Sequence, residues 1–117
     1  TDDDILWSFE HERCHVEIPR TYNNISIPNY TDQAQAIAVA QALIDTKYVE
    51  ELRCYTHQFN EVKRFKVSPE DYNGTLRSFR LFYDILLADS NGNDLKAYFA
   101  QRLIKNHFIN PYQLQFR

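Results

Sequence analysis

The chain has 117 residues, which is enough for one hydrophobic core and too few for two well-separated domains. Its formal net charge of −3 excludes the strongly basic surface that wholesale nucleic-acid binding needs, and no apolar run reaches the roughly 20 residues of a membrane-spanning helix. Two glycines and four prolines are few for a turn-rich all-β chain. We therefore expect one mostly helical domain, and we interpret it as a piece of a larger protein.

Residues 2–13 are predicted to form the first helix, because the aspartates that lead into it complement the positive end of the helix dipole. Its apolar stripe is formed by Ile5, Leu6 and Phe9, with Trp7 beside it. From residue 15 to residue 30 we expect an irregular connection, since the prolines within it exclude a regular helix.

Residues 31–46 are predicted to form a second helix, because N-cap residues are followed by alanines and glutamines that favour helix. The many alanines leave a shallow surface that lets a neighbouring element approach closely. We expect this helix to be central to the core, with Ala38 and Ala42 in a close-packed interface.

The segment from Lys47 to residue 67 is interpreted as two short strands, because aromatic and β-branched residues recur at near-strand spacing. No Asn-Gly or Asp-Gly pair lies between the two strands, so we expect a long, loose turn rather than a tight hairpin. A helix followed by such a hairpin is typical of the end of a winged-helix domain. The predicted fold class is therefore α+β, mostly helical, with a winged-helix-like core and a small β-hairpin.

Several short strings in residues 31–67 resemble the last helix and hairpin of a DEP domain: Ala34-Gln35-Ala36-Ile37-Ala38, Gln41-Ala42 with Asp45, and His57 with Phe59 and Glu61. DEP domains are small winged-helix modules that recruit signalling proteins to membranes, receptors or other proteins. The resemblance implies a docking domain without catalytic activity. It further implies a cytoplasmic location, either free or at the surface of a membrane. The chain departs from the family upstream, where CHVEIPRTYNNISIPNY replaces a helix that usually ends in Trp-Leu.

Residues 75–108 are predicted to form a helix hairpin that follows a connector at residues 68–73. Leu76, Phe79, Tyr83 and Leu86 lie on one helical face, and the sequence around Gly92 interrupts the pattern before a second apolar face begins. Asn93 or Asp94 is the expected N-cap of the second helix.

The cysteines and histidines leave three alternatives open. His11 and Cys14 form an H-x2-C pair, and Cys54 and His57 form a C-x2-H pair, so the four side chains are candidate ligands for a structural zinc ion. The same cysteines are candidates for a disulfide, which would indicate an oxidising compartment. They are also candidates for buried free thiols. Of these we expect free thiols, and we expect neither a metal nor another cofactor.

Three sequons, at Asn24, Asn29 and Asn73, lie in predicted connectors, where a glycan would be tolerated. They support a second interpretation of the chain, as a secreted, glycosylated helical domain held by Cys14–Cys54 that binds a receptor. The same pattern also arises in a cytoplasmic chain that is rich in asparagine.

No nucleophile elbow, glycine-rich phosphate loop or isolated pair of carboxylates marks a catalytic site, so we expect a non-enzyme without a small-molecule substrate. The predicted function is a docking module of a signalling or membrane-trafficking protein that binds a protein partner or an anionic membrane. The expected binding residues cluster around the predicted wing: Lys47, Arg53, Lys63, Arg64 and Lys66. A solvated strand face and a winged-helix nucleic-acid binder are the alternatives, and the sequence predicts no oligomeric state.

Overall fold

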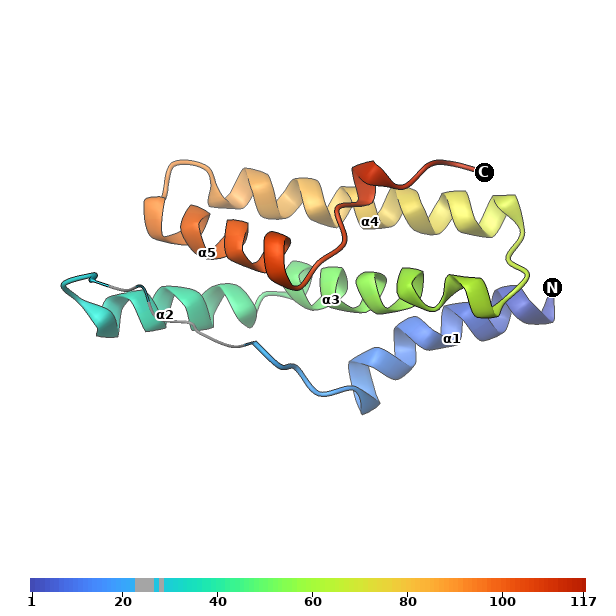
Figure 1. Cartoon of the computed structure of the whole chain (residues 1–117), viewed down its shortest axis with the longest axis horizontal. Helices are drawn as coiled ribbons and strands as arrows, with labels where there is room; N and C mark the ends of the chain where they lie inside the picture. The colour runs from blue at the N-terminus through green and yellow to red at the C-terminus, as the bar shows by residue number, and fades with distance from the viewer. Residues whose placement is uncertain (23–26, 28) are drawn as a thin grey trace.

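The computed structural model describes residues 1–22, 27 and 29–117. The described chain folds into α-helices α1 (Asp2–Glu17), α2 (Gln33–Ile44), α3 (Lys47–Asn60), α4 (Pro69–Ser90) and α5 (Asp94–Asn106), with short 3-10 helices η1 (Val62–Arg64) and η2 (Pro111–Gln113) (Figure 1). It contains no strand in the residues that the structure describes. The predicted α+β class and its β-hairpin are therefore wrong, and the fold is all-helical.

The segment predicted to form the hairpin is α3 followed by η1. Its buried residues Val49, Leu52 and Phe59 stand at positions i, i+3 and i+10, which is helical spacing. Thr46 caps the helix by accepting a hydrogen bond from the amide of Val49. The aromatic and β-branched residues that favour a strand locally instead form one apolar face of a helix, because tertiary packing overrides their weak intrinsic preference.

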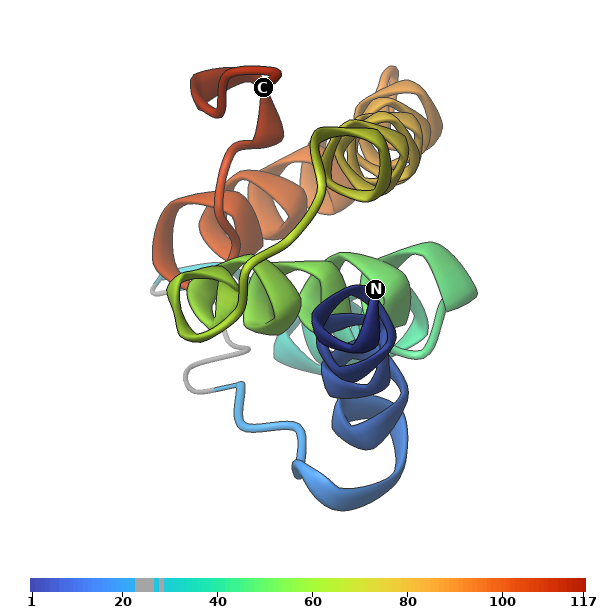
Figure 2. The ribbon, with the colours of Figure 1, turned by 90° about the vertical axis from the view of Figure 1, so that its right-hand side faces the viewer.

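Helix α3 lies at the centre of the arrangement. Figure 1 shows α2 and α3 following one another along the long axis, with α4 running back along one side and α5 turning again to run in the direction of α2. The view in Figure 2 places α1 and α4 on different sides of α3. The principal extents of the molecule are 53 × 27 × 18 Å, so the fold is elongated.

An aromatic cluster joins α1, α3 and α4. Trp7 is fully buried, and its indole nitrogen donates a hydrogen bond of 2.7 Å to the carbonyl of Gln58. Its ring meets Phe59 edge-on at 5.2 Å between centroids and stacks on Tyr72 at 6.2 Å. These contacts fix the first half of α1 against the end of α3 and the start of α4.

Helix α2 packs against α5 through small residues. Ala36 and Ala40 are fully buried, and Leu43 continues the same helical face. The alanines predicted to be buried, Ala38 and Ala42, are exposed instead. Alanine occupies both faces of this helix, so composition does not distinguish the buried face. The buried face is the one that leads to Leu43 and Ile44.

We predict opposite outcomes for two glutamate substitutions on α2. Ala40→Glu should lower the free energy of unfolding by at least about 3 kcal/mol, because it forces a carboxylate into a close-packed apolar interface. Ala38→Glu, which adds the same group to the exposed face, should change it by less than about 0.5 kcal/mol. Urea denaturation followed by circular dichroism measures both, and equal effects would contradict the packing of α2.

Helix α4 begins at Pro69, earlier than predicted, so the expected connector at residues 68–73 is wrong. Ser68 is the N-cap, and proline occupies the first turn, where its missing N–H costs nothing. The amide of Ser68 donates a hydrogen bond of 2.8 Å to the carboxylate of Asp4. This bond from Ser68 lowers the pKa of Asp4 to about 2, and it ties the start of α1 to the start of α4.

We predict that Asp4 contributes to acid stability. A carboxylate whose pKa is depressed in the folded state stabilises the fold at pH values above its unfolded pKa of about 4. That contribution is lost as the pH falls through the folded value of about 2. Asp4→Asn should therefore reduce stability at pH 6 and flatten the pH dependence between about 4 and 2. Asp2→Asn, at an exposed position, is the control; an unchanged pH profile in Asp4→Asn would contradict the prediction.

Candidate functional site

A disulfide joins Cys14 of α1 to Cys54 of α3 across 5.4 Å between their Cα atoms. Both cysteines are fully buried. The disulfide uses both sulfur atoms, so the free thiols that we expected are a wrong prediction. It also rules out the zinc site in which both thiolates are ligands with His11 and His57.

Histidines and glutamates from the same helices surround the disulfide. His11 and His15 stand one turn apart on α1 and face Glu50 and Glu51 on α3. His11 Nε2 lies 2.8 Å from Glu51 Oε2, and His15 Nε2 lies 3.2 Å from Glu51 Oε1. His15 Nδ1 lies 2.9 Å from Glu50 Oε2. We call His11, His15, Glu50 and Glu51 the histidine–glutamate cluster.

Arg53 organises one side of this cluster. Its guanidinium contacts Glu50 at 2.7 Å and donates to the backbone carbonyls of Ile18 at 2.8 Å and Cys14 at 3.2 Å. Burial opposes the charge on Glu50, but hydrogen bonds from Arg53 and His15 outweigh it and lower the pKa of Glu50. Glu50 is therefore a charged, oriented acceptor for the Nδ1 side of His15.

A second group of charges lies further along the same interface. Glu10 is buried and accepts two hydrogen bonds from Arg13, which lower its pKa despite desolvation. Arg64 also reaches Glu10, at 3.4 Å, and His57 lies 3.8 Å away. These contacts offset the negative charge of the buried Glu10 carboxylate, and the one from Arg64 attaches η1 to α1.

The sequence reasoning missed a motif that identifies the cluster. Residues 11–15 read H-E-R-C-H, which is an H-E-x-x-H pattern on a helix. In that pattern the two histidines lie on one helical face and can bind one zinc ion. The ligand set that we considered from the sequence combined His11 with Cys14, Cys54 and His57 and left out His15. The spacing of His11 and His15 by one turn was the signal that could have revealed it.

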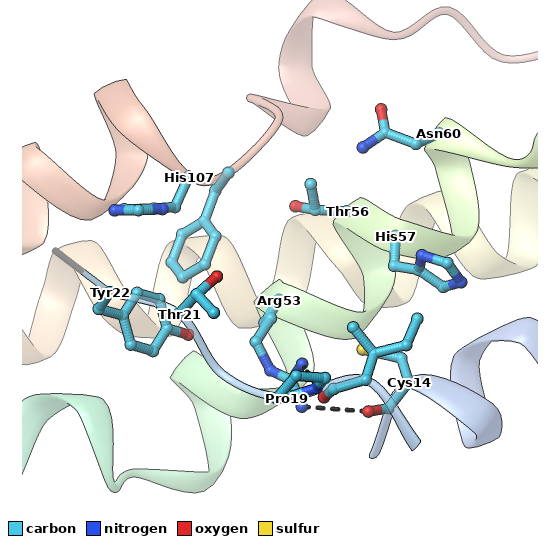
Figure 3. A pocket seen from close by; sticks show the side chains of 11 residues that line it. Cys14, Pro19, Thr21, Tyr22, Arg53, Thr56, His57, Asn60 and His107 are labelled. Atoms are coloured by element: carbon cyan, nitrogen blue, oxygen red, sulfur yellow. Dashed lines mark hydrogen bonds between the residues drawn. The ribbon is translucent and has the colours of Figure 1, made fainter. Parts of the chain in front are cut away.

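A pocket of about 320 Å³ opens beside the disulfide, between α3 and the segment that follows α1. Figure 3 shows Cys14 and His57 toward one end of it and Tyr22 and His107 toward the other, with Arg53 between them. The rings of Tyr22 and His107 meet edge-on at 5.2 Å. Burial raises the pKa of Tyr22 to about 12, so its hydroxyl stays neutral at physiological pH.

The outer face of α1 carries large apolar side chains among its polar residues. Its exposed residues include Ile5, Leu6, Phe9 and Val16, which are 60%, 51%, 65% and 86% exposed. The predicted apolar stripe of the first helix therefore faces outward, and Trp7 beside it enters the core. We call Ile5, Leu6, Phe9 and Val16 the α1 apolar face.

The predicted binding residues are spread from the start of α3, through its middle at Arg53, to the segment after it, and do not form one wing. Lys47 opens the helix, whereas Lys63, Arg64 and Lys66 follow it. Arg53 is mostly buried in its ion pair with Glu50, and Arg64 is paired with Glu61 at 2.9 Å. Lys47, Lys63 and Lys66 have exposed side chains. Membrane or partner binding through these five residues stays a prediction.

The sequons differ in their surroundings. Asn29 is exposed, and Asn24 lies outside the described residues. Asn73 lies in the first turns of α4 rather than in a connector, and its side-chain amide exchanges two hydrogen bonds with the backbone of Arg117, at 2.9 and 2.8 Å. A glycan on Asn73 would break this pairing. Of the two sequon asparagines that the structure describes, Asn29 is therefore the more suitable glycan acceptor.

Comparison with protein-family models, curated proteins and solved structures finds no match for this chain. The resemblance to DEP domains therefore stays a prediction, although the wing that it implies is a helix. None of the described helices combines the length and apolar character that a membrane-spanning helix needs.

We predict that the disulfide is a major source of stability. It closes a loop of 40 residues between α1 and α3. Chain entropy alone then gives a contribution of about 4 kcal/mol for a loop of this length. Replacing both cysteines with serine should lower the free energy of unfolding by roughly that amount. Guanidinium denaturation measures it, and a thiol titration of the unfolded, unreduced protein should find no free thiol. Two titratable thiols would contradict the disulfide.

Proposed function

We propose that the chain is a non-catalytic docking module of an oxidising compartment. In this proposal it binds an amphipathic helix of a partner protein that carries apolar side chains flanked by lysine or arginine. The α1 apolar face is the observation that carries the proposal, because four large apolar side chains share the outer face of one helix without covering one another.

The shape of this region suits a helical partner. A shallow groove of about 340 Å³ runs beside Ile5 and Phe9 and is bounded by Glu12 and by Asp71 of α4. Groove-binding helices insert apolar side chains spaced by three or four residues into such a surface. Phe9 is the expected anchor, because aromatic side chains contribute most of the binding energy at many interfaces.

Acidic residues around the α1 apolar face indicate that the partner carries basic residues beside its apolar side chains. Asp2 and Glu12 are exposed on α1, and Asp71 is exposed across the groove, whereas Glu17 is paired with Arg13 of the same helix at 3.6 Å. A partner with basic residues beside its apolar anchors would pair with these carboxylates, which raises the association rate and fixes orientation. A partner with acidic flanks would be repelled.

A protein partner is better supported than an anionic membrane. The basic residues expected at a membrane include Arg53 and Arg64, and both are engaged with carboxylates of the same chain. The surface with exposed apolar residues is acidic, so a negatively charged lipid surface would oppose it.

The disulfide supports the compartment. Disulfides persist in secreted, extracellular and secretory-pathway proteins and are rare in the cytoplasm, where thiols are kept reduced. A buried Cys14–Cys54 bond therefore favours the secreted alternative over the cytoplasmic location that the DEP resemblance implies. An exposed sequon at Asn29 is compatible with the same compartment.

The proposal predicts that the disulfide-intact chain selects basic amphipathic peptides from a phage-displayed random library. Enriched peptides should carry apolar residues at helical spacing with adjacent lysine or arginine. Phe9→Ser should weaken binding of a selected peptide by about thirtyfold or more, the effect of losing an interface hot spot. Fluorescence anisotropy with the labelled peptide measures the affinity.

Leu81→Ser is the control, because Leu81 is another large apolar residue with a similar exposed fraction, 57%, and lies on α4. It should leave peptide affinity unchanged. Both variants should keep the wild-type melting temperature, since neither removes a core contact. The proposal fails if no peptide is enriched, or if the enriched peptides bind the Phe9→Ser variant as tightly as the wild type.

A further inference from the structure

We propose that His11, His15 and Glu51 form a binding site for one zinc ion between α1 and α3. The two histidines belong to the H-E-x-x-H motif, and the glutamate comes from the facing helix. Two imidazoles and one carboxylate make a common set of protein ligands for zinc. The proposal concerns metal binding and assigns no reaction.

The distances from Glu51 to the two histidines are close to those between ligand atoms around a tetrahedral ion, and one ligand nitrogen of His11 lies within 4.8 Å of one of His15. Zinc binds imidazole nitrogen at about 2.0 to 2.1 Å and carboxylate oxygen at similar distances, so neighbouring ligand atoms around it lie about 3.3 Å apart. The Glu51 oxygens already lie 2.8 Å from His11 Nε2 and 3.2 Å from His15 Nε2. Small side-chain shifts would therefore admit the ion where the hydrogen bonds now run.

The chemistry of each nitrogen agrees with this assignment. His11 Nδ1 is enclosed by protein without a hydrogen-bond partner, so Nε2 is the nitrogen that a ligand can reach. His15 Nδ1 faces Glu50, 2.9 Å away. A carboxylate at that nitrogen holds the proton there and leaves Nε2 free for metal, as the outer partners of metal-binding histidines do. Arg53 in turn fixes Glu50.

The site is partly exposed on the side of His15. The side chains of His15, Glu51 and His11 are 22%, 18% and 10% exposed, and His15 also lines a groove of about 540 Å³ together with Glu50. Glu12 lies close enough that one of its oxygens and one nitrogen each of His11 and His15 fall within 4.8 Å of one another. Water or Glu12 can therefore complete the coordination as a fourth ligand.

Zinc is the expected metal because of the ligand types. Calcium and magnesium prefer oxygen ligands, whereas imidazole nitrogen suits zinc, copper, iron and nickel. Two histidines and one carboxylate also bind ferrous iron, but two histidines in an H-E-x-x-H helix are typical of zinc. The disulfide keeps Cys14 and Cys54 out of the ligand set, so the site differs from the four-ligand site expected from the sequence.

The test is a zinc titration of the unreduced full chain by isothermal calorimetry after removal of bound metal. We expect one zinc ion per chain. Glu50→Gln, which keeps the direct ligands but weakens the contacts of Glu50 with His15 and Arg53, should weaken binding by about 10- to 100-fold. Glu51→Gln, which removes a direct ligand, should weaken it by at least about 100-fold. His107→Asn removes a histidine outside the cluster and should leave the affinity unchanged.

A second measurement does not depend on the variants folding. Nitrogen-15 spectra of the wild-type imidazoles should show the Nε2 signals of His11 and His15 shifting on addition of zinc, with His107 unaffected. The proposal is overturned if the unreduced chain binds no stoichiometric zinc, or if binding appears only after reduction of the disulfide. It is also overturned if the signals of His107 shift in place of those of His11 and His15.

Discussion

Cys14 and Cys54 bind α1 to α3 at points inside both helices, and the positions of the remaining elements follow from this bond and the aromatic cluster beside it. Trp7 seals the same interface by stacking on Tyr72 and meeting Phe59 edge-on, so that α1 is attached both covalently and by packing. Because α3 also packs against α4, the disulfide indirectly anchors the helix hairpin at the other side of the molecule. A chain of this size gains much from such a link, since its core is small.

The same bond sets the register that brings the charged side chains together. With Cys14 opposite Cys54, the histidines one turn apart on α1 face the glutamates at the start of α3. The inner face of α1 then carries Trp7, Cys14 and the residues of the ion pairs. Ile5, Leu6, Phe9 and Val16 lie on its outer face. The orientation of α1 therefore places the proposed metal site on the side that faces α3 and the proposed docking surface on the opposite side.

Part of this arrangement could be predicted from the sequence. The helices at residues 2–13, 31–46 and 75–108 are confirmed in type, because their caps and apolar spacing are strong. The wing was wrong because Val49, Leu52 and Phe59 were assigned a period of two, although their spacing is helical. The pairing of His11 with His15 was missed because the H-x2-C and C-x2-H spacings indicated a ligand set of His11, Cys14, Cys54 and His57. Which face of α1 is buried could not be inferred, since Trp7 and the outward Ile5, Leu6 and Phe9 are all apolar, and only the position of α3 decides between them.

The central claim, that α1 and α3 form one covalently fixed unit, is tested most directly by native-state hydrogen exchange of the backbone amides, resolved by residue. The account predicts that with the disulfide intact the central amides of α1 and α3 exchange slowly and at similar rates, because they open together. Reduction should speed exchange in α1 much more than in α4. Rapid exchange throughout α1 in the unreduced protein, or a strand-like alternating protection pattern in residues 47–60, would contradict the account.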